Sequence, residues 1–448
     1  MNPVSRQEAS INVVTDSVRQ KLEDGSAKIS VIGLGYVGLS LAVELAKAGF
    51  AVHGIDLDLE RVNRLNQGES YLVDVSTEVL APLVADKRLT ASTVFDRAGE
   101  ADVLIICVPT PLRKTKEPDI SYILSALESV LPRLRPGQLM VLESTTYPGT
   151  TEEVVQPRLE ANGLVIGRDF FLAFSPERVD PGNKRFTTAN IPKVVGGVTP
   201  ACTGLAASLY RRVTSQVFEV SSPRVAETAK LLENTFRSVN IALANELAFA
   251  CRRIGVDPWE VIDAAATKPF GFMPFYPGPG IGGHCIPVDP LYLSWKVRLS
   301  GYEAQFIALA DQVNRAMPEH VVTLLTEALN DRGRALRGSS VLVLGVTYKA
   351  DVNDIRESPA LEIIEMLERK GGRVSYADPF TPQLTVGGVK LAAVEATPDS
   401  IAAADCVLIL TSHSSFDYAV IADRASLVVD TRNALKAHRQ NRSSIVTL

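Results

Sequence analysis

The chain has 448 residues, more than one ordinary hydrophobic core accommodates, which predicts two or three domains. Hydrophobic residues make up 46% of the chain and charged residues 22%, as in an ordinary globular protein. The formal net charge of −5 gives no reason to expect nucleic acid or an anionic membrane surface as a partner.

The N-terminal extension, residues 1–27, is polar and mixed in charge, and the chain has no run of about 18 apolar residues. Five cysteines are scattered without paired spacing: Cys107, Cys202, Cys251, Cys285 and Cys406. This spacing argues against a zinc site and against a disulfide framework. We therefore expect no metal, no membrane partner and a reducing, cytoplasmic location.

Residues 28–56 have the pattern of a strand, a glycine turn, a helix and a second strand. The turn is Gly33-x-Gly35-x-x-Gly38, and Asp56 closes the second strand. This order predicts a βαβ unit in a parallel sheet. In such a turn the first glycine permits the bend and the second lets a pyrophosphate approach the backbone. The third lets the helix pack closely against the strand.

The same turn predicts an NAD site. The N–H groups of the helix start, at Tyr36 and Val37, would face the phosphates. Asp56 can accept hydrogen bonds from a ribose diol and would repel a 2′-phosphate, which favours NAD over NADP. Arg61 could lie over the adenine or simply pair with Asp58.

Further apolar strands are expected at residues 101–108, 138–143 and 170–175. Pro109 and Thr110 follow the first of them and Thr145 follows the second, at the sheet edge where such cofactors bind. Residues of these types are also common in ordinary loops. We assign residues 28–215 to an NAD-binding Rossmann domain.

Residues 216–332 are expected to form a helical central domain. Arg224–Ile254 has helical spacing and contains neither proline nor glycine, so it predicts one long helix and a candidate subunit interface. A second helix is expected over Gly301–Ala316.

The first pattern restarts in residues 333–448. A strand runs into Gly345, a second strand ends at Asp378, and residues 404–410 repeat the character of residues 101–107. The second and third glycines are missing after Gly345, so we expect this domain to hold a different nucleotide or only to support the first. The predicted fold class is α/β, with two doubly wound Rossmann-like domains joined by a helical central domain.

Cys285 lies in a loop of glycines and prolines, Pro277-Gly278-Pro279-Gly280-Ile281-Gly282-Gly283-His284-Cys285. Bare backbone of this kind lets another molecule come within covalent distance of the sulfur. A thiolate beside a nicotinamide could add to an aldehyde, and oxidation of the adduct would give a thioester for water to cleave. The alternative is a glycine-rich turn with a buried cysteine.

Lys230 and Asn234 are four residues apart and share one face of the predicted long helix. A lysine and an amide directed at one carbonyl would stabilise an oxyanion. We place Leu231 and Leu232 on the opposite, packing side. The alternative for Lys230 and Asn234 is a solvated helix face.

Glu177 follows an apolar strand in Ser175-Pro176-Glu177-Arg178, at the sheet edge where α/β proteins bind ligands. An exposed salt bridge with Arg178 is the alternative. Asp289 could hold the cysteine loop or hydrogen-bond a catalytic partner. His284 is not assigned as a base, because neighbours on extended backbone point in opposite directions.

Together these motifs resemble the family of nucleotide-sugar 6-dehydrogenases, the UDP-glucose and GDP-mannose dehydrogenase group, from Lys28 to Asn433. The resemblance implies that Cys285 is the nucleophile, that Lys230 and Asn234 stabilise the oxyanion, and that Glu177 activates the hydrolytic water. It further implies that Thr145 orders water near the nicotinamide and that Asp289 is the family's catalytic-site aspartate after the cysteine.

The resemblance also implies a UDP-sugar as substrate. The segment from Tyr348 to Pro359 looks like the family's nucleotide-contacting segment, with Lys349 and Arg356 as its diphosphate or sugar contacts. The complete set of implied substrate contacts is Glu177, Arg178, Lys230, Asn234, Lys268, Tyr276, Gly282, Lys349 and Arg356. A homodimer or a higher homo-oligomer is expected.

Within the family, the cysteine loop and Lys268-Pro269-Phe270-Gly271-Phe272 resemble the branch that oxidises UDP-N-acetylhexosamines, more specifically UDP-N-acetylglucosamine. Val288 replaces a lysine of the UDP-glucose branch, and Pro181 replaces its second glutamate. The expected activity is NAD-dependent four-electron oxidation of the C6 hydroxyl to a uronic acid.

Other readings remain open. UDP-glucose or UDP-N-acetylmannosamine could be the substrate. A two-electron dehydrogenase of the 6-phosphogluconate type would have no use for Cys285. A non-catalytic regulator would bind NAD or a nucleotide sugar without forming NADH.

Overall fold

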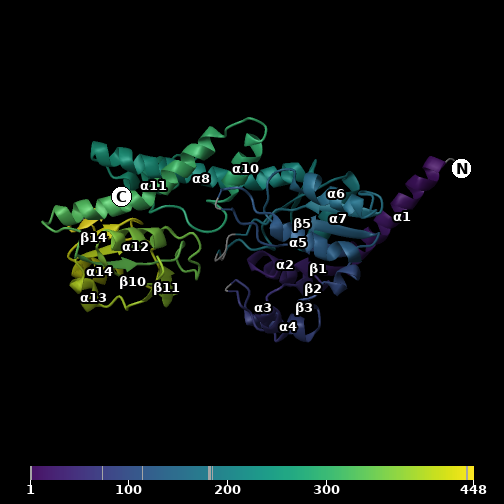
Figure 1. Cartoon of the computed structure of the whole chain (residues 1–448), viewed down its shortest axis with the longest axis horizontal. Helices are drawn as coiled ribbons and strands as arrows, with labels where there is room; N and C mark the ends of the chain where they lie inside the picture. Colours follow the sequence, from purple (N-terminus) through teal and green to yellow (C-terminus); the bar gives the residue numbers. More distant parts are fainter. Residues whose placement is uncertain (1–2, 73, 114, 180–182, 184, 440–441) are drawn as a thin grey trace. The chain divides into compact units, whose positions relative to one another are not determined.

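The computed structural model describes residues 3–72, 74–113, 115–179, 183, 185–439 and 442–448, with side chains from Val14 onward. The chain divides into two compact units. The first comprises Met1–Glu233 and Leu291–Ser300, and the second comprises Asn234–Pro290 and Gly301–Leu448. Figure 1 labels many of the helices and strands of both. None of the described helices is long and apolar enough to cross a membrane.

The first unit is built on an eight-stranded sheet with the order β3-β2-β1-β4-β5-β6-β7-β8. Neighbouring strands are parallel except β6 and β7, which pair antiparallel. The strands are β1 (Lys28–Ile32), β2 (Ala51–Ile55), β3 (Leu89–Ser92), β4 (Val103–Ile106), β5 (Gln138–Leu142), β6 (Phe170–Phe174), β7 (Lys193–Gly197) and β8 (Val217–Val220).

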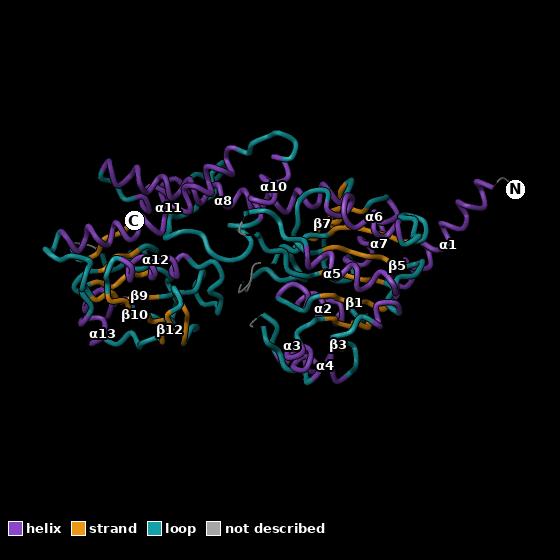
Figure 2. The backbone as a smooth tube through the Cα atoms, viewed as in Figure 1, coloured by secondary structure: helices purple, strands orange, loops and turns teal. Residues whose placement is uncertain are grey.

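Helices cover both faces of this sheet (Figure 2). Successive strand residues alternate between two hydrophobic cores: Val31 and Ile105 belong to one, Ile32 and Ile106 to the other. Strands buried on both faces have continuous apolar sequences, which is why they could be predicted. The helices are α1 (Pro3–Asp24), α2 (Tyr36–Lys47), α3 (Leu59–Asn66), α4 (Thr77–Ala85), α5 (Ser121–Val130), α6 (Gln156–Ala161) and α7 (Pro200–Tyr210), with shorter helical turns η1 (Asp96–Gly99), η2 (Leu131–Arg133) and η3 (Thr151–Val155).

The second unit contains a five-stranded parallel sheet with the order β10-β9-β13-β14-β15. Its strands are β9 (Ser340–Leu344), β10 (Arg373–Ala377), β13 (Cys406–Ile409), β14 (Val428–Asp430) and β15 (Ile445–Thr447), with a separate hairpin of β11 (Gln383–Val386) and β12 (Val389–Ala392). Its helices are α9 (Pro258–Ala266), α11 (Gln305–Asn330), α12 (Pro359–Arg369), α13 (Pro398–Ala403) and α14 (Tyr418–Arg424).

Two helices contain residues of both units, α8 (Pro223–Ile254) and α10 (Asp289–Arg298). The predicted long helix is therefore confirmed in α8. The fold class is confirmed as well, because two Rossmann-like sheets are accompanied by a helical central region.

Two local predictions were wrong, and one helix was not predicted. The helix expected over Gly301–Ala316 extends through Pro318 to Asn330, because Met317, Val321 and Leu325 on its buried face pack into the core. Helix α10 was not predicted, since its apolar residues do not follow a one-face spacing. Leu232 is exposed rather than packed, although Leu231 is fully buried.

Candidate active site

The glycine turn of the first unit has the geometry that its sequence predicts. Gly33 has a φ of 89° and donates its N–H to Ile55 O at 2.8 Å, which closes the turn. A Cβ on Gly38 would lie 1.8 Å from Gly33 O, so the helix can approach the strand only with glycine there. A Cβ on Gly35 would meet nothing within 4 Å. The backbone at Gly35 is thus open to a ligand.

A cleft lies beside this turn, lined by Gly35, Tyr36, Asp58, Glu60, Arg61, Arg64, Tyr71 and Leu72. The Asp56 carboxylate accepts the N–H groups of Leu34 at 2.7 Å and Asp58 at 2.9 Å. Arg61 lies 3.3 Å from Asp58 and 3.6 Å from Asp56, so the predicted pairing with Asp58 is confirmed. Tyr36 and Val37 begin α2 and are half-buried. These residues fit a dinucleotide.

The other predicted cofactor residues follow β4 and β5. Thr110 is buried, and its carbonyl accepts the hydroxyl of Tyr292 from α10. Pro109 is exposed and Thr145 is half-buried. The Ser144 hydroxyl donates to Val108 O at 2.8 Å and joins the two loops.

Glu177 follows β6, and its side chain is 11% exposed. One carboxylate oxygen accepts the N–H groups of Arg178 and Val179, both at 2.7 Å. The Arg178 guanidinium pairs with Glu233 at 2.7 Å, so the predicted alternative of a Glu177–Arg178 salt bridge is wrong. Burial opposes ionisation of Glu177, yet Lys193 and the two N–H groups lower its pKa. Pro181 lies outside the described residues.

Lys193 and Glu143 lie beside Glu177 and were not predicted as site residues. The Lys193 ammonium is 3.0 and 2.9 Å from the two oxygens of Glu143 and 3.4 Å from Glu177. The sequence feature that could have identified them is their place beside apolar strands: Glu143 directly follows β5, and Lys193 begins β7.

In the second unit, the cysteine loop leaves its thiol accessible. Cys285 is exposed, so the alternative of a buried cysteine is wrong. The Cys285 carbonyl accepts the N–H groups of Val288 at 3.2 Å and Asp289 at 2.8 Å, which fixes the turn into α10. Burial lowers the pKa of the neighbouring His284.

Asp289 is 2% exposed and accepts the Asn234 side-chain N–H at 2.5 Å. This contact fixes the Asn234 amide, as the second option for Asp289 predicted. Lys230 and Asn234 lie one turn apart on α8 and are only 8% and 6% exposed. The alternative of a solvated helix face is therefore wrong.

The glycines before Cys285 pack on the predicted nucleotide-contacting segment. Gly283 N–H donates to Arg356 O at 2.9 Å. A Cβ on Gly282 would lie 2.6 Å from the Tyr348 Cβ, so a side chain there would separate the two segments. Lys349 is half-buried, and the exposed Arg356 guanidinium is 2.6 Å from Asp354.

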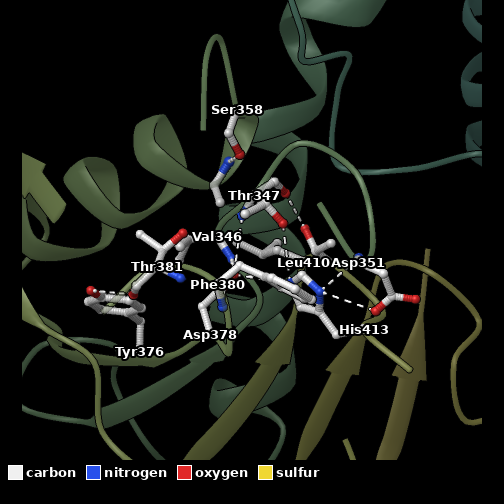
Figure 3. Close-up of polar contacts among 12 residues, drawn as sticks. Val346, Thr347, Asp351, Ser358, Tyr376, Asp378, Phe380, Thr381, Leu410 and His413 are labelled. Carbon is white, nitrogen blue, oxygen red and sulfur yellow. Dashed lines mark hydrogen bonds and ion pairs between the residues drawn. The ribbon is translucent and has the colours of Figure 1, made fainter. Parts of the chain in front are cut away.

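The buried side chain of His413 contacts the backbone of the same nucleotide-contacting segment (Figure 3). His413 is fully buried, and its Nδ1 accepts the Asp351 N–H at 3.0 Å. Its Nε2 lies 3.0 Å from the Asp378 carboxylate and 3.2 Å from the Thr347 hydroxyl. Since Nδ1 is an acceptor, the proton is on Nε2 and is donated to Asp378.

The remaining predicted substrate residues lie elsewhere in the second unit. Tyr276 stacks on Trp259 and donates to Asp263 at 2.7 Å. Lys268 is exposed, with its ammonium 5.0 Å from the Phe270 ring centroid.

Arg432 is a cation that sequence analysis missed. A Cβ on Gly278 would lie 2.8 Å from its guanidinium, so this charge borders the cysteine loop. Burial lowers the pKa of Arg432 to about 10, and it stays cationic at neutral pH. Its only sequence signal is its place after an apolar strand.

A parallel sheet with this glycine turn and Asp56 defines a dinucleotide-binding protein of the Rossmann class. Comparison with known families is more specific. Three models of the UDP-glucose/GDP-mannose dehydrogenase family match: the NAD binding domain over residues 27–214, the central domain over 224–316 and the UDP binding domain over 342–437. The chain belongs to this family and is an NAD-dependent nucleotide-sugar dehydrogenase.

Individual relatives support this assignment. The chain is 40% identical over 355 residues to the UDP-N-acetyl-D-glucosamine 6-dehydrogenase of Pseudomonas aeruginosa, covering 79% of this chain and 83% of that protein. It is 34% identical over 422 residues to the UDP-N-acetyl-D-mannosamine dehydrogenase of Methanococcus maripaludis strain C7, covering 91% and 93%. The solved UDP-D-ManNAc dehydrogenase of Pyrococcus horikoshii has a TM-score of 0.85 at 32% identity, covering 94% and 98%.

Proposed function

We propose that the chain oxidises the C6 hydroxyl of a UDP-N-acetylhexosamine to the carboxylate, with UDP-N-acetylglucosamine as the expected substrate. The N-acetylhexosamine assignment is supported by the names of the relatives described above. The cysteine-loop motif and the 40% identity to the P. aeruginosa protein favour glucosamine. UDP-N-acetylmannosamine is the second candidate, because relatives of that name match over 91% of the chain.

The observation that carries the proposal is the position of Cys285. The exposed thiol lies on a glycine loop whose backbone is bonded to the nucleotide-contacting segment, at Gly283 and Arg356. In the same unit, Asn234 is fixed by Asp289 at 2.5 Å. A sugar held by this segment would therefore have a nucleophile and an amide donor supplied by one unit.

The chemistry follows from these groups. NAD, when bound through the glycine turn and Asp56, supplies the electron acceptor for both oxidations. The Cys285 thiolate adds to the C6 aldehyde, and oxidation of that adduct leaves a thioester. Lys230 and Asn234 stabilise the negative charge that develops on the carbonyl oxygen.

Glu177 completes the reaction as the base for hydrolysis. Its carboxylate takes a proton from water, the resulting hydroxide adds to the thioester carbonyl, and the C–S bond breaks to release the acid and the thiolate. The lowered pKa of Glu177 keeps it ionised, as a base requires.

The decisive test is the yield of NADH from limiting UDP-N-acetylglucosamine with excess NAD. Two NADH per sugar are expected, because two electron pairs leave C6. One NADH per sugar would overturn the thioester route. Parallel assays with UDP-N-acetylmannosamine and UDP-glucose, compared by kcat/KM, identify the sugar.

A two-electron dehydrogenase is the rival enzyme, and Cys285→Ala separates the two. Full turnover in this variant would support the rival. Tight binding of both ligands without NADH would instead support a regulator.

We also propose a homodimer or higher homo-oligomer that buries one stripe of α8. Phe236, Leu243 and Ile254 are 46%, 62% and 73% exposed and recur at helical spacing on one face. Exposed apolar stripes of this kind are typical of interfaces. Leu243→Asp should convert the protein to monomers in light scattering, whereas Arg237→Ala, at an exposed position of α8 off the stripe, should not.

A further inference from the structure

In the first unit, a charged cluster that the proposed reaction does not use lies next to Glu177. Lys193 begins β7, Glu143 follows β5, and Tyr210 ends α7. The side chains of Lys193 and Glu143 are 4% and 0% exposed. Charged groups are rarely buried to this degree unless they are paired.

Hydrogen bonds link Glu177 to Lys193, Lys193 to Glu143 and Glu143 to Tyr210. An ammonium has three N–H donors, and Lys193 has three carboxylate oxygens within 3.4 Å: two of Glu143 and one of Glu177. The Tyr210 hydroxyl donates to Glu143 from the other side. The Lys193 ammonium is therefore held in place by the Glu143 carboxylate, which solvent does not reach.

Two carboxyl groups contact this one ammonium, and their pKa values are shifted in opposite directions. Burial and the nearby Glu177 raise the pKa of Glu143. For Glu177, the effect of burial is exceeded by Lys193 and two backbone N–H groups, and its pKa is lowered. Neighbouring carboxyls whose pKa values are pushed apart can have separate acid–base roles.

We propose that Lys193, held in place by Glu143 and Tyr210, is the positioning residue that keeps Glu177 ionised and oriented toward the water it activates. The inference rests on the proposed role of Glu177 as the hydrolytic base. It explains why a lysine is buried at this strand start. It also explains why Glu143, which does not reach the surface, carries a carboxylate.

Other charged groups near Glu177 do not replace Lys193. The Lys230 ammonium, on α8, also lowers the pKa of Glu177 but ranks after Lys193 and the two backbone N–H groups. The Arg178 guanidinium is paired with Glu233. Burial raises the pKa of the Cys107 thiol, so Cys107 stays neutral at physiological pH.

The test uses two substitutions with opposite predicted signs. Lys193→Met removes the ammonium and should move the acid limb of the kcat–pH profile upward by about one unit or more. Glu143→Gln removes the second carboxyl partner of the ammonium, so Lys193 pairs with Glu177 alone and the same limb should move downward. A merely structural role would lower activity in both variants and leave the limb in place, which would overturn the proposal.

Pre-steady-state kinetics adds a second readout. In Lys193→Met, NADH should form in a burst of about two per site, followed by slow turnover, because the acyl-enzyme accumulates before hydrolysis. If the burst itself slows as much as turnover does, Lys193 does not act through the hydrolytic step and the proposal fails.

Two controls separate the possible failures. Glu177→Gln should retain the burst and lose steady-state turnover; unchanged turnover would refute the role of Glu177 itself. If Glu177→Gln behaves as expected and the Lys193→Met profile matches wild type, only the Lys193 inference fails.

The double variant Lys193→Met with Glu143→Gln has no second buried carboxylate, so it should fold even if the single variant does not. With the ammonium gone, its limb should again lie above that of wild type, and a wild-type limb would overturn the proposal.

Discussion

Asp56 and Asp378 follow equivalent strands of the two Rossmann-like sheets, yet their carboxylates have different partners. Both sheets repeat the same backbone contacts. Gly33 and Gly345 donate to the residue at the end of the second strand, at 2.8 and 2.9 Å. Each carboxylate then accepts the next N–H, from Leu34 or Val346, at 2.7 Å.

The difference comes from the residue four positions after the adjacent strand. In the first unit this is Thr110, whose carbonyl is bonded to Tyr292. In the second it is His413, whose ring donates to Asp378. Asp56 remains 10% exposed, and Asp378 is fully buried. The same strand-end acid thus contacts Arg61, which lines a cleft, in one sheet and is an internal hydrogen-bond acceptor in the other.

The largest expected effect is on stability. Asp378→Asn would place amide hydrogens against the N–H groups of Phe380 and Thr381, which the carboxylate now accepts at 2.8 and 3.1 Å. We expect a loss of about 3 kcal/mol or more in urea unfolding. Asp56→Asn keeps an acceptor for Leu34, and its amide hydrogens would face only the exposed N–H of Asp58, which water can satisfy, so it should cost about 1 kcal/mol. Equal losses would contradict the comparison.

The stability difference at Asp378 should also depend on pH. Burial alone would raise the pKa of Asp378, but His413 and backbone N–H groups hold it below the ordinary 3.8. A carboxyl with a lowered folded pKa contributes stability above its unfolded pKa and loses it as pH falls through the folded pKa. The gap between wild type and Asp378→Asn should be constant near neutrality and shrink below about pH 4. A gap that grows in acid would reverse this sign.

The next effect is on cofactor binding. Asp56→Asn should raise the KM for NAD about tenfold, because one charge-assisted pair of hydrogen bonds to the cofactor is lost. It should also weaken discrimination against NADP, because a neutral amide no longer repels a 2′-phosphate. The KM for the UDP-sugar is the internal control and should stay unchanged.

Substitutions at His413 should act on the second unit, through the nucleotide segment and through Asp378, which loses its donor. His413→Leu removes the acceptor for Asp351 N–H and should weaken UDP binding about three- to tenfold in calorimetry. Asn has an acceptor near the position of Nδ1, so His413→Asn should lie between Leu and wild type. An equal change in NAD affinity would show a general loss of structure instead.

Arg61→Ala should have the smallest effect. Arg61 is 45% exposed, and its ion pairs with Asp58 and Asp56 are screened by solvent. A change of about twofold or less in the KM for NAD is expected. A tenfold change would show that Arg61 contacts the cofactor directly.

Local pattern predicted the features that depend on neighbouring residues in the chain. The apolar strands, the glycine turn and helix α8 followed from spacing, and the family followed from the resemblance of the motifs. The residues assigned to the reaction stay predictions, although the structure places Asn234 against Asp289 and leaves Cys285 exposed.

Contacts between distant segments could not be predicted. Lys193 meets Glu143 across 50 residues and His413 meets Asp378 across 35, and neither pair has a spacing that a single sequence displays. The continuation of α11 beyond Pro318 depends on tertiary packing in the same way. An acid follows the second strand of each sheet in the sequence; the glycine pattern separated the two copies, but the burial of Asp378 against His413 could not be predicted.

The exposure of Cys285 has a practical consequence. The other four cysteines are buried, so an alkylating reagent should modify one residue of the native protein and all five after denaturation. The reagent consumed per chain would then rise from one towards five equivalents as the unfolded fraction of a preparation grows. The same accessibility exposes this thiol to peroxide, so oxidative damage would begin at Cys285.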